Sequence, residues 1–441
     1  MEVHAVQQPI HFGQELRRLR ISSNLSLTDL AKLVHYSKGQ LSKVERGLKA
    51  PSRDLVRLCD VKLGAGGALA RLVPVSSDPP ADLTTTDDAD KKEVWLMRLS
   101  LDGQSWFQPI GRRQVLSLGA MSVAGMGIGV TGGSSGAKAA LGTGSESVLE
   151  ASRALFDQYR RLGQIAHPTV VLPALVAQTH TLREVAAEAA PRVRRGLLRL
   201  GSRYAEYAGW LVQESGNDEG ALWWTRLAVE LATAGGDRHL ASYGLVRRAL
   251  ITMYRQDAAQ TVGLARQAQT GGTPPRIRGL AAQREAQGHA IACDYDACMS
   301  ALDRSRSLLA MEKADQDEPA IGTTNLPDPV AMITGWCLYD LGRPDEAAAL
   351  LDRELGRLAP QAVRARVRFG VRRALAYAAA GEVDHACALT RDLLGDLVTV
   401  GSATITSDLR TLARMLNRYP KNPAVRDLSP ELSAALRIVA L

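Results

Sequence analysis

Residues 25–47 read LSLTDLAKLVHYSKGQLSKVERG, and they are the most informative segment for the structure of the N-terminal part of the chain. A short polar turn from His35 to Ser37 separates two segments with helical spacing of apolar residues. Ser37 stands where the second helix begins and can cap its first amide groups, and Gly47 stands where that helix ends. The pattern predicts a helix, a tight turn and a second helix. The apolar positions are Leu27, Leu30, Ala31, Val34, Leu41 and Val44.

The longer segment LSLTDLAKLVHYSKGQLSKVERGLKAPS resembles the helix-turn-helix of the Cro/C1-type (XRE) regulators, over about residues 12–64. The resemblance implies a lambda-repressor-like domain that binds double-stranded DNA with its second helix in the major groove. Leu27 departs from the family, where many members carry a phosphate-contacting Gln, and Gly39 replaces a side chain that often reads a base. The residues in register with the family pattern are Glu45, Arg46, Gly47, Pro51 and Ser52.

Transfer by position from this family implies the DNA-binding residues. Those that would face bases are Lys38, Gly39, Ser42 and Lys43, and those placed for phosphates are Ser37, Arg46, Lys49 and Arg53, with Gln40 in the same set. The family also implies that Arg20 pairs with Glu45, which would tie the first helix to the recognition helix.

Charge is concentrated at the N-terminus. The chain has a net charge of +8, and residues 1–77 hold twelve Lys and Arg against six Asp and Glu, so six of the eight positive charges lie there. A basic domain with a groove-entering helix is typical of DNA binding. We expect such binding to weaken steeply with salt.

Composition divides the chain into three parts. Residues 1–74 form the expected DNA-binding domain, residues 75–145 a linker and connector, and residues 146–441 a helical domain. The linker sequence SSDPPADLTTTDDADKK, residues 76–92, lacks an apolar period. Residues 93–111 are compatible with a short helix and strand or with an extended docking segment that buries Trp95, Trp106 and Phe107.

Residues 114–130 leave three interpretations open. An uncharged apolar stretch after Arg112 and Arg113 could anchor the chain in a membrane, although it is short and rich in glycine. The glycines at 127, 129 and 132 spell GxGxxG, but no strand–helix–strand context follows them. The third interpretation is a small-residue helix or connector.

The remainder of the chain contains a degenerate internal repeat. Five turn positions align, separated by 40, 37, 49 and 39 residues: Gly216, Gln256, Cys293, Gly342 and Gly381. Seven residues before each stands a small residue (Gly209, Ala249, Ala286, Gly335 and Ala374), and five residues after each stands Ala221, Thr261, Cys298, Ala347 or Ala386. This spacing resembles the tetratricopeptide motif and implies an all-α chain in which the helix-turn-helix domain precedes a tetratricopeptide-like α-solenoid.

A concave surface of such a solenoid would carry the ligand site. Mixed aromatic, amide and charged side chains there suit a peptide or a partner helix, and we expect a peptide or protein ligand. The expected groove residues are Arg203, Glu206, Trp210, Gln213, Tyr243, Met253, Gln283, Gln287, Trp336, Tyr339 and Arg368. The segment MEKADQDEPAIGTTNLPDP, residues 311–329, interrupts the repeats either as a lid over this groove or as a plain insertion.

Catalytic and metal-binding patterns find little support. Five scattered cysteines without an N-terminal signal peptide predict a reducing cytoplasm. His289, Cys293 and Cys298 could suggest a metal or redox site, yet Cys298 occupies a repeat position that requires a small residue. No GxSxG or Walker sequence occurs, so we expect neither an enzyme nor a cofactor or metal.

The sequence therefore predicts a cytoplasmic, sequence-specific transcriptional regulator that binds double-stranded DNA as a homodimer, because two-fold operators match two-fold proteins. A membrane-anchored regulator tethered through residues 114–130 and a repeat scaffold without specific DNA binding are the alternatives.

Overall fold

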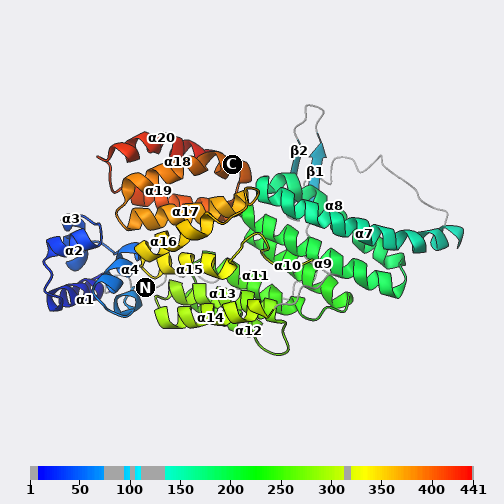
Figure 1. The fold of residues 1–441 in the computed structure, drawn as a ribbon, viewed down its shortest axis with the longest axis horizontal. Coiled ribbons are helices and arrows are strands. Elements are labelled where there is room, and N and C mark those ends of the chain that lie inside the picture. The colour runs from blue at the N-terminus through cyan, green and yellow to red at the C-terminus, as the bar shows by residue number, and fades with distance from the viewer. Residues whose placement is uncertain (1–7, 74–93, 100–104, 111–134, 312–318, 440–441) are drawn as a thin grey trace, which may run out of the picture.

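The computed structural model describes residues 8–73, 94–99, 105–110, 135–311 and 319–439, which are all-α apart from one hairpin (Figure 1). The N-terminal helices are α1 (Gln8–Ser22), α2 (Leu27–Leu33), α3 (Lys38–Glu45), α4 (Arg53–Lys62) and α5 (Ala68–Arg71). The later helices are α7 (Ser135–Ile165), α8 (Pro168–Glu188), α9 (Pro191–Glu214), α10 (Asp218–Ala234), α11 (Leu240–Tyr254), α12 (Ala258–Ala268), α13 (Pro275–Ile291), α14 (Tyr295–Ala310), α15 (Pro329–Asp340), α16 (Pro344–Leu355), α17 (Val363–Ala379), α18 (Val383–Val400), α19 (Ala403–Leu416) and α20 (Pro423–Ile438).

The N-terminal helices pack around one apolar core that includes Leu16, Leu30 and Leu41, all fully buried. Helix α1 crosses the end of α3 very closely at Gly13. A Cβ at that position would lie 2.5 Å from the Val44 carbonyl oxygen, so the crossing requires glycine. This contact fixes the position of α3 on the domain.

From α8 onward, consecutive helices stack in antiparallel pairs as an α-solenoid (Figure 1). The five predicted turn residues each connect the two helices of a pair and adopt a left-handed backbone. Their φ angles are +86° at Gly216, +61° at Gln256, +59° at Cys293, +76° at Gly342 and +89° at Gly381. The predicted repeat register is therefore confirmed.

Small residues permit close approach within each pair. A Cβ on Gly209 would lie 2.9 Å from the Trp224 Cβ, and one on Gly335 would lie 2.7 Å from the Leu351 Cγ. Cys298, the small residue five positions after the third turn, is fully buried. The packing role predicted for these positions is thus confirmed, because any larger side chain would force the helices apart.

The solenoid curves until its early and late helices meet. Glu214 at the end of α9 accepts hydrogen bonds from Arg368 on α17 at 2.6 Å and from Ser402 and Thr404 at the start of α19, at 2.6 and 2.9 Å. Arg364 adds an ion pair at 3.2 Å. Although burial alone would raise the pKa of Glu214, the two arginines and the Ser402 hydroxyl hold it at about 2. These contacts join the end of α9 to α17 and α19, and removing one partner would leave a buried charge without compensation.

Two strands, β1 (Val94–Leu99) and β2 (Ser105–Ile110), form an antiparallel hairpin in which Val94 faces Ile110. Residues 93–111, left ambiguous by the sequence, thus include a hairpin. The proposed membrane segment and the GxGxxG glycines lie outside the described residues. Among the helices that the structure describes, none has the length and apolar character needed to cross a bilayer.

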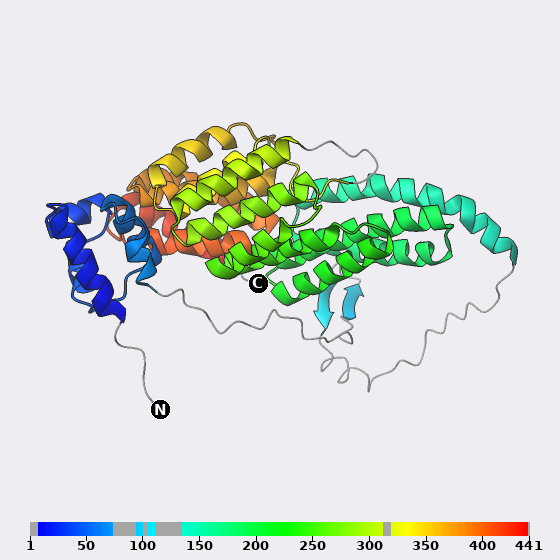
Figure 2. The ribbon, with the colours of Figure 1, turned by 90° about the horizontal axis from the view of Figure 1, so that it is seen from below.

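Figure 2 shows the N-terminal domain at one end of the long axis and the start of α7 at the other. Helix α7 begins at Ser135, so the end of the expected connector, residues 135–145, is helical. The N-terminal domain packs against the ends of the later helices, and this placement determines which of its basic side chains remain accessible.

Candidate nucleic-acid interface

Helices α2 and α3 begin at hydrogen-bonded caps. The Ser26 Oγ accepts from the Asp29 amide at 3.1 Å, and the Asp29 carboxylate accepts from the Ser26 amide at 3.1 Å. The Ser37 Oγ accepts from the Gln40 amide at 3.2 Å, as the sequence predicts. Gly47 ends the second helix with φ +70°. These local bonds define both ends of the helix that would enter a groove.

A half-buried ion pair holds α3 against α1. The Arg20 Nε lies 2.6 Å from the Glu45 Oε1, and the Arg20 Nη1 donates to the Leu25 carbonyl at 2.9 Å. The predicted pair is confirmed. It ties the C-terminal end of α3 to the first helix and so restricts the tilt of α3.

The outer face of α3 carries the predicted DNA-binding residues. Gln40 and Ser42 are partly buried. Within the described ranges, no lysine of α3 or of the following turn forms an ion pair with a carboxylate, so these cations are available to an anionic partner. The exposed members of the set are Ser37, Lys38, Gly39, Lys43, Arg46 and Lys49.

Gly39 is not required by packing. A Cβ built there has no heavy atom within 4 Å outside its own turn. The glycine leaves the backbone of the first turn of α3 uncovered, beside Lys38 and Lys43. This arrangement suits close approach of a phosphate or a base edge.

Arg53 differs from the other predicted phosphate contacts. Its Nη1 donates to the Gln256 Oε1 at 3.0 Å, which places the guanidinium on the solenoid. Burial lowers the pKa of Arg53, and the positive charge of Arg57 adds to this effect. Arg53 therefore serves the contact between domains in this arrangement.

The N-terminal domain docks on the solenoid along the row of turns that the repeats align. Gln256 accepts from Arg53, a Cβ on Gly342 would lie 2.7 Å from the Arg57 carbonyl oxygen, and one on Gly381 would lie 2.5 Å from the His35 ring. The edge formed by successive helix-pair turns is thus the docking surface for α4 and the α2–α3 turn.

The turn between α19 and α20 extends this docking surface. The Tyr419 hydroxyl donates to the His35 carbonyl at 3.2 Å, and the Arg418 guanidinium carbon lies 4.3 Å from the centre of the Tyr36 ring. Tyr36 immediately precedes the cap of α3, so the solenoid contacts the chain beside the start of α3.

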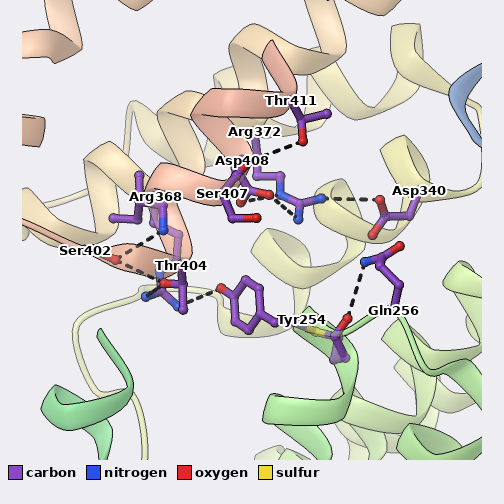
Figure 3. A network of polar contacts seen from close by, with 12 residues as sticks. Tyr254, Gln256, Asp340, Arg368, Arg372, Ser402, Thr404, Ser407, Asp408 and Thr411 are labelled. Carbon is purple, nitrogen blue, oxygen red and sulfur yellow. Dashed lines mark hydrogen bonds and ion pairs between the residues drawn. The ribbon is translucent and has the colours of Figure 1, made fainter. Parts of the chain in front are cut away.

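Buried charges link α4 to the interior of the solenoid. The Arg57 Nη1 lies 3.2 Å from the Asp340 Oδ1, which also pairs with the Arg372 Nη1 at 3.3 Å. Arg372 in turn forms two hydrogen bonds to Asp408, at 2.8 and 2.9 Å. Figure 3 shows Arg372 between Asp340 and Asp408. Removing one member of such a chain leaves a buried charge without its partner.

The predicted groove residues divide into two sets. Six of them line a partly open cavity of about 150 Å³ in the solenoid: Arg203, Glu206, Trp210, Tyr243, Gln283 and Arg368. The other five are buried among helices and do not line it: Gln213, Met253, Gln287, Trp336 and Tyr339. The expected groove residues therefore do not form one continuous accessible surface.

Trp336 illustrates the second set. It is 3% exposed, the Arg372 guanidinium carbon lies 3.6 Å from its ring centre, and Tyr254 and Phe369 meet it edge to face. Such a ring contributes to the core, and its removal would cost about 3–5 kcal/mol. Trp336 is therefore a structural residue rather than an accessible ligand contact.

The described part of the 311–329 interruption lies over the cavity. Arg160 donates to the Ala320 and Gly322 carbonyls at 2.8 and 2.7 Å, and Arg276 donates to the Ile321 carbonyl at 2.6 Å. Four residues of this segment line the cavity: Ala320, Gly322, Thr323 and Asn325. This position matches the lid interpretation for residues 319–325.

The cysteines are free, and four of the five are buried. Cys293 lies in a turn, and His289 lies near Glu285 and Asp294, at 3.7 and 3.8 Å. In the part of the chain that the structure describes, no three metal-ligating side chains gather at one point.

Sequence reasoning missed the docking residues, chiefly Arg57, Gln256 and Asp340. The available signal was weak: Arg53 and Arg57 lie one turn apart on α4, and Gln256 and Cys293 stand at left-handed turn positions where the other repeats have glycine. Neither pattern indicates which residues would be in contact, because the contacts join residues about 200 to 280 positions apart.

Comparison with known proteins supports the N-terminal assignment. A family model described as a helix-turn-helix domain matches residues 11–73. No curated protein and no solved structure matches the chain. Together with the capped and exposed α3, the family match identifies residues 11–73 as a DNA-binding helix-turn-helix domain.

Proposed function

We propose that this protein is a sequence-specific transcriptional regulator of the XRE type, in which residues 1–74 hold operator DNA. The observation that carries the proposal is the outer face of α3, where Lys38 and Lys43 are exposed beside Gly39 within a matched helix-turn-helix domain. Lysines reach guanine acceptors in the major groove, and the capped helix terminus suits a phosphate.

Selection of bound genomic fragments tests this proposal. At moderate salt, the purified full-length chain should enrich a small set of fragments that share a motif, and affinity should fall steeply as salt rises. Binding without enrichment of any motif would instead support the alternative of a repeat scaffold that lacks specific DNA recognition.

We further propose that the solenoid, residues 146–441, is a tetratricopeptide relative that senses a peptide or protein, with residues 75–145 as connector. Its cavity supports this role, and a physical connection to α4 exists. Arg368 lines the cavity and donates to the Tyr254 hydroxyl at 3.4 Å, and the Tyr254 ring packs on Trp336. Arg372 also packs on Trp336, and it forms an ion pair with Asp340. Asp340 is in turn the ion-pair partner of Arg57 on α4. A ligand regulates only if it binds docked and undocked arrangements with different affinity.

Dimerisation completes the proposal. One small helix-turn-helix covers little DNA, and paired half-sites match a two-fold dimer. Light scattering on the complex with a selected fragment should give two chains per operator. One chain per operator would contradict the dimer while leaving sequence recognition intact.

A further inference from the structure

The cavity inside the solenoid has an unusual charge balance. It is lined by five arginines and one glutamate, alongside aromatic and aliphatic side chains. Its volume of about 150 Å³ equals that of engineered cavities that hold one benzene molecule. The space therefore suits one small group, which includes the terminal residue of a peptide, rather than a whole peptide.

Four of the five arginines already have partners. Arg203 pairs with Asp237 at 3.1 Å, Arg247 with Glu206 at 3.7 Å, and Arg368 with Glu214 at 2.6 Å. Arg160 donates to two carbonyls of the covering segment. These contacts explain the four cations as parts of the fold.

Arg284 is the exception. Its contact is a long one from Nη1 to the Met253 sulfur, at 3.9 Å, and no carboxylate of the described chain lies within ion-pair distance. Burial lowers the pKa of Arg284 to about 10, and the nearby Arg368 adds to the effect. Arg284 is partly buried, and holding a guanidinium away from bulk water without a counter-charge is costly, so this position favours an anion.

The neighbouring Gln283 supplies a second, independent observation. Gln283 is 2% exposed and lines the same cavity, and its Nε2 has no acceptor among the described residues. Buried amide donors are nearly always hydrogen-bonded. Two adjacent residues of α13 therefore present N–H donors to one cavity, and both lack an acceptor oxygen.

The other walls define what such an anion would be attached to. The rings of Tyr207 and Trp210 stack at 5.4 Å, and Leu250 and Leu280 lie on the lining. A carboxylate accepts hydrogen bonds from guanidinium and amide donors of this kind, and an apolar or aromatic body fits these walls.

We propose that this cavity binds a carboxylate attached to a small apolar or aromatic group, with Arg284 and Gln283 as its donors. The carboxylate belongs either to a small organic acid or to the C-terminus of a peptide. This inference rests on the sensing role proposed for the solenoid and specifies its ligand chemistry.

The test uses the full-length chain and four probes: benzoate, its neutral analogue benzamide, the acetylated dipeptide Gly-Phe with a free carboxyl terminus, and the same dipeptide as an amide. Calorimetric titration and thermal unfolding are measured at matched ionic strength. Benzoate or the free-acid dipeptide should bind and raise the Tm, and their amides should not.

Arg284→Met separates a binding role from a structural one. It should reduce carboxylate affinity at least about tenfold, because a charge-assisted hydrogen bond is lost. The same variant should keep or raise the Tm of the free protein, because a partly buried cation without a counter-charge is removed. Arg226→Met, on the exposed surface of α10, is the matched control and should change neither quantity.

Gln283→Glu gives a second test that does not depend on tolerance of Arg284→Met. It attaches a carboxylate to the cavity, so it should raise the Tm and block benzoate. Binding of the free-acid dipeptide alone assigns the carboxylate to peptides, and binding of benzoate assigns it to small acids; both support the shared chemistry.

Three results would overturn the proposal: no binding of either carboxylate, equal binding of acids and amides, or full carboxylate affinity in Arg284→Met. None of these bears on selection of operator fragments, which is measured without ligand. Conversely, carboxylate binding without operator selection would leave a ligand-binding solenoid and refute the DNA proposal.

Discussion

The helix-turn-helix domain has two basic faces, of which one is exposed to solvent and the other contacts the solenoid. On α3, Lys38 and Lys43 are exposed and free of ion pairs within the described ranges. On α4, Arg53 and Arg57 are directed into the solenoid, where Gln256 and Asp340 accept their hydrogen bonds. Charge alone therefore does not define a DNA-binding surface, since half of this basic set holds two domains together.

Side-chain chemistry fits the division. The guanidinium of Arg57 bonds to Asp340 and Gln256 at once and tolerates burial through these partners. Lysine ammonium groups are strongly hydrated, and those of α3 stay in water. Four changes test whether the α3 and α4 faces differ in this way.

Arg57→Ala should have the largest effect. It leaves Asp340 buried with Arg372 as its one remaining cation, and we expect a loss of about 3 kcal/mol in the free energy of unfolding. Chemical denaturation measures this loss, and Arg17→Ala on the exposed side of α1 is the control. A loss no greater than that of Arg17→Ala would show that the α4 face is not the docking face.

Lys43→Ala should give the next largest effect, and on DNA instead of stability. Loss of a base contact should weaken binding to a selected operator about tenfold to a hundredfold, with an unchanged Tm. Gel shifts compare it with Arg17→Ala, which removes the same charge outside the recognition helix. Equal weakening by both variants would mean that α3 supplies only general attraction.

Gly342→Ala tests the docking edge against an equivalent turn. Both Gly342 and Gly216 have positive φ, so alanine at either should cost about 1–2 kcal/mol in backbone strain. Only at Gly342 would the new Cβ lie 2.7 Å from a backbone oxygen of α4, that of Arg57. Faster proteolysis between the domains is expected for Gly342→Ala, and the same rate in Gly216→Ala would contradict the docking contact.

Acid should weaken docking slightly through His35, which we expect to be the smallest effect. Burial and the charge of Lys62 lower the pKa of His35 below 6.5, partly opposed by Asp345. The docked state then takes up the proton less readily than the free domain. The contribution of neutral His35 to the free energy of docking is therefore complete above pH 6.5, and it is lost as the pH falls toward the depressed pKa.

Small-angle scattering between pH 7.5 and 5.5 should detect a larger radius of gyration at the acidic end. His35→Gln should reduce this change. An identical pH response in the variant would assign it to other groups.

Much of the candidate DNA site could be predicted from sequence, because its determinants are local. The Ser37 cap, the left-handed Gly47 and the apolar period around Leu41 each act within a few residues. The groove was predicted less well. Trp336 and Gln287 were expected on an accessible surface, and both are buried; Trp336 packs against Tyr254 of α11 and Phe369 of α17, contacts that no local sequence pattern indicates.

The helix-turn-helix pair and the repeat register follow from the sequence, since caps, helical periodicity and left-handed turns are short-range preferences. Three features depend instead on long-range packing: the contact of Arg57 with Asp340, the bonds by which Glu214 joins α9 to α17 and α19, and the position of Arg284 in a cavity without a counter-charge. Each helix pair of a solenoid is rotated slightly relative to the next one. Because these small rotations add up along the chain, only their sum determines which distant residues come into contact.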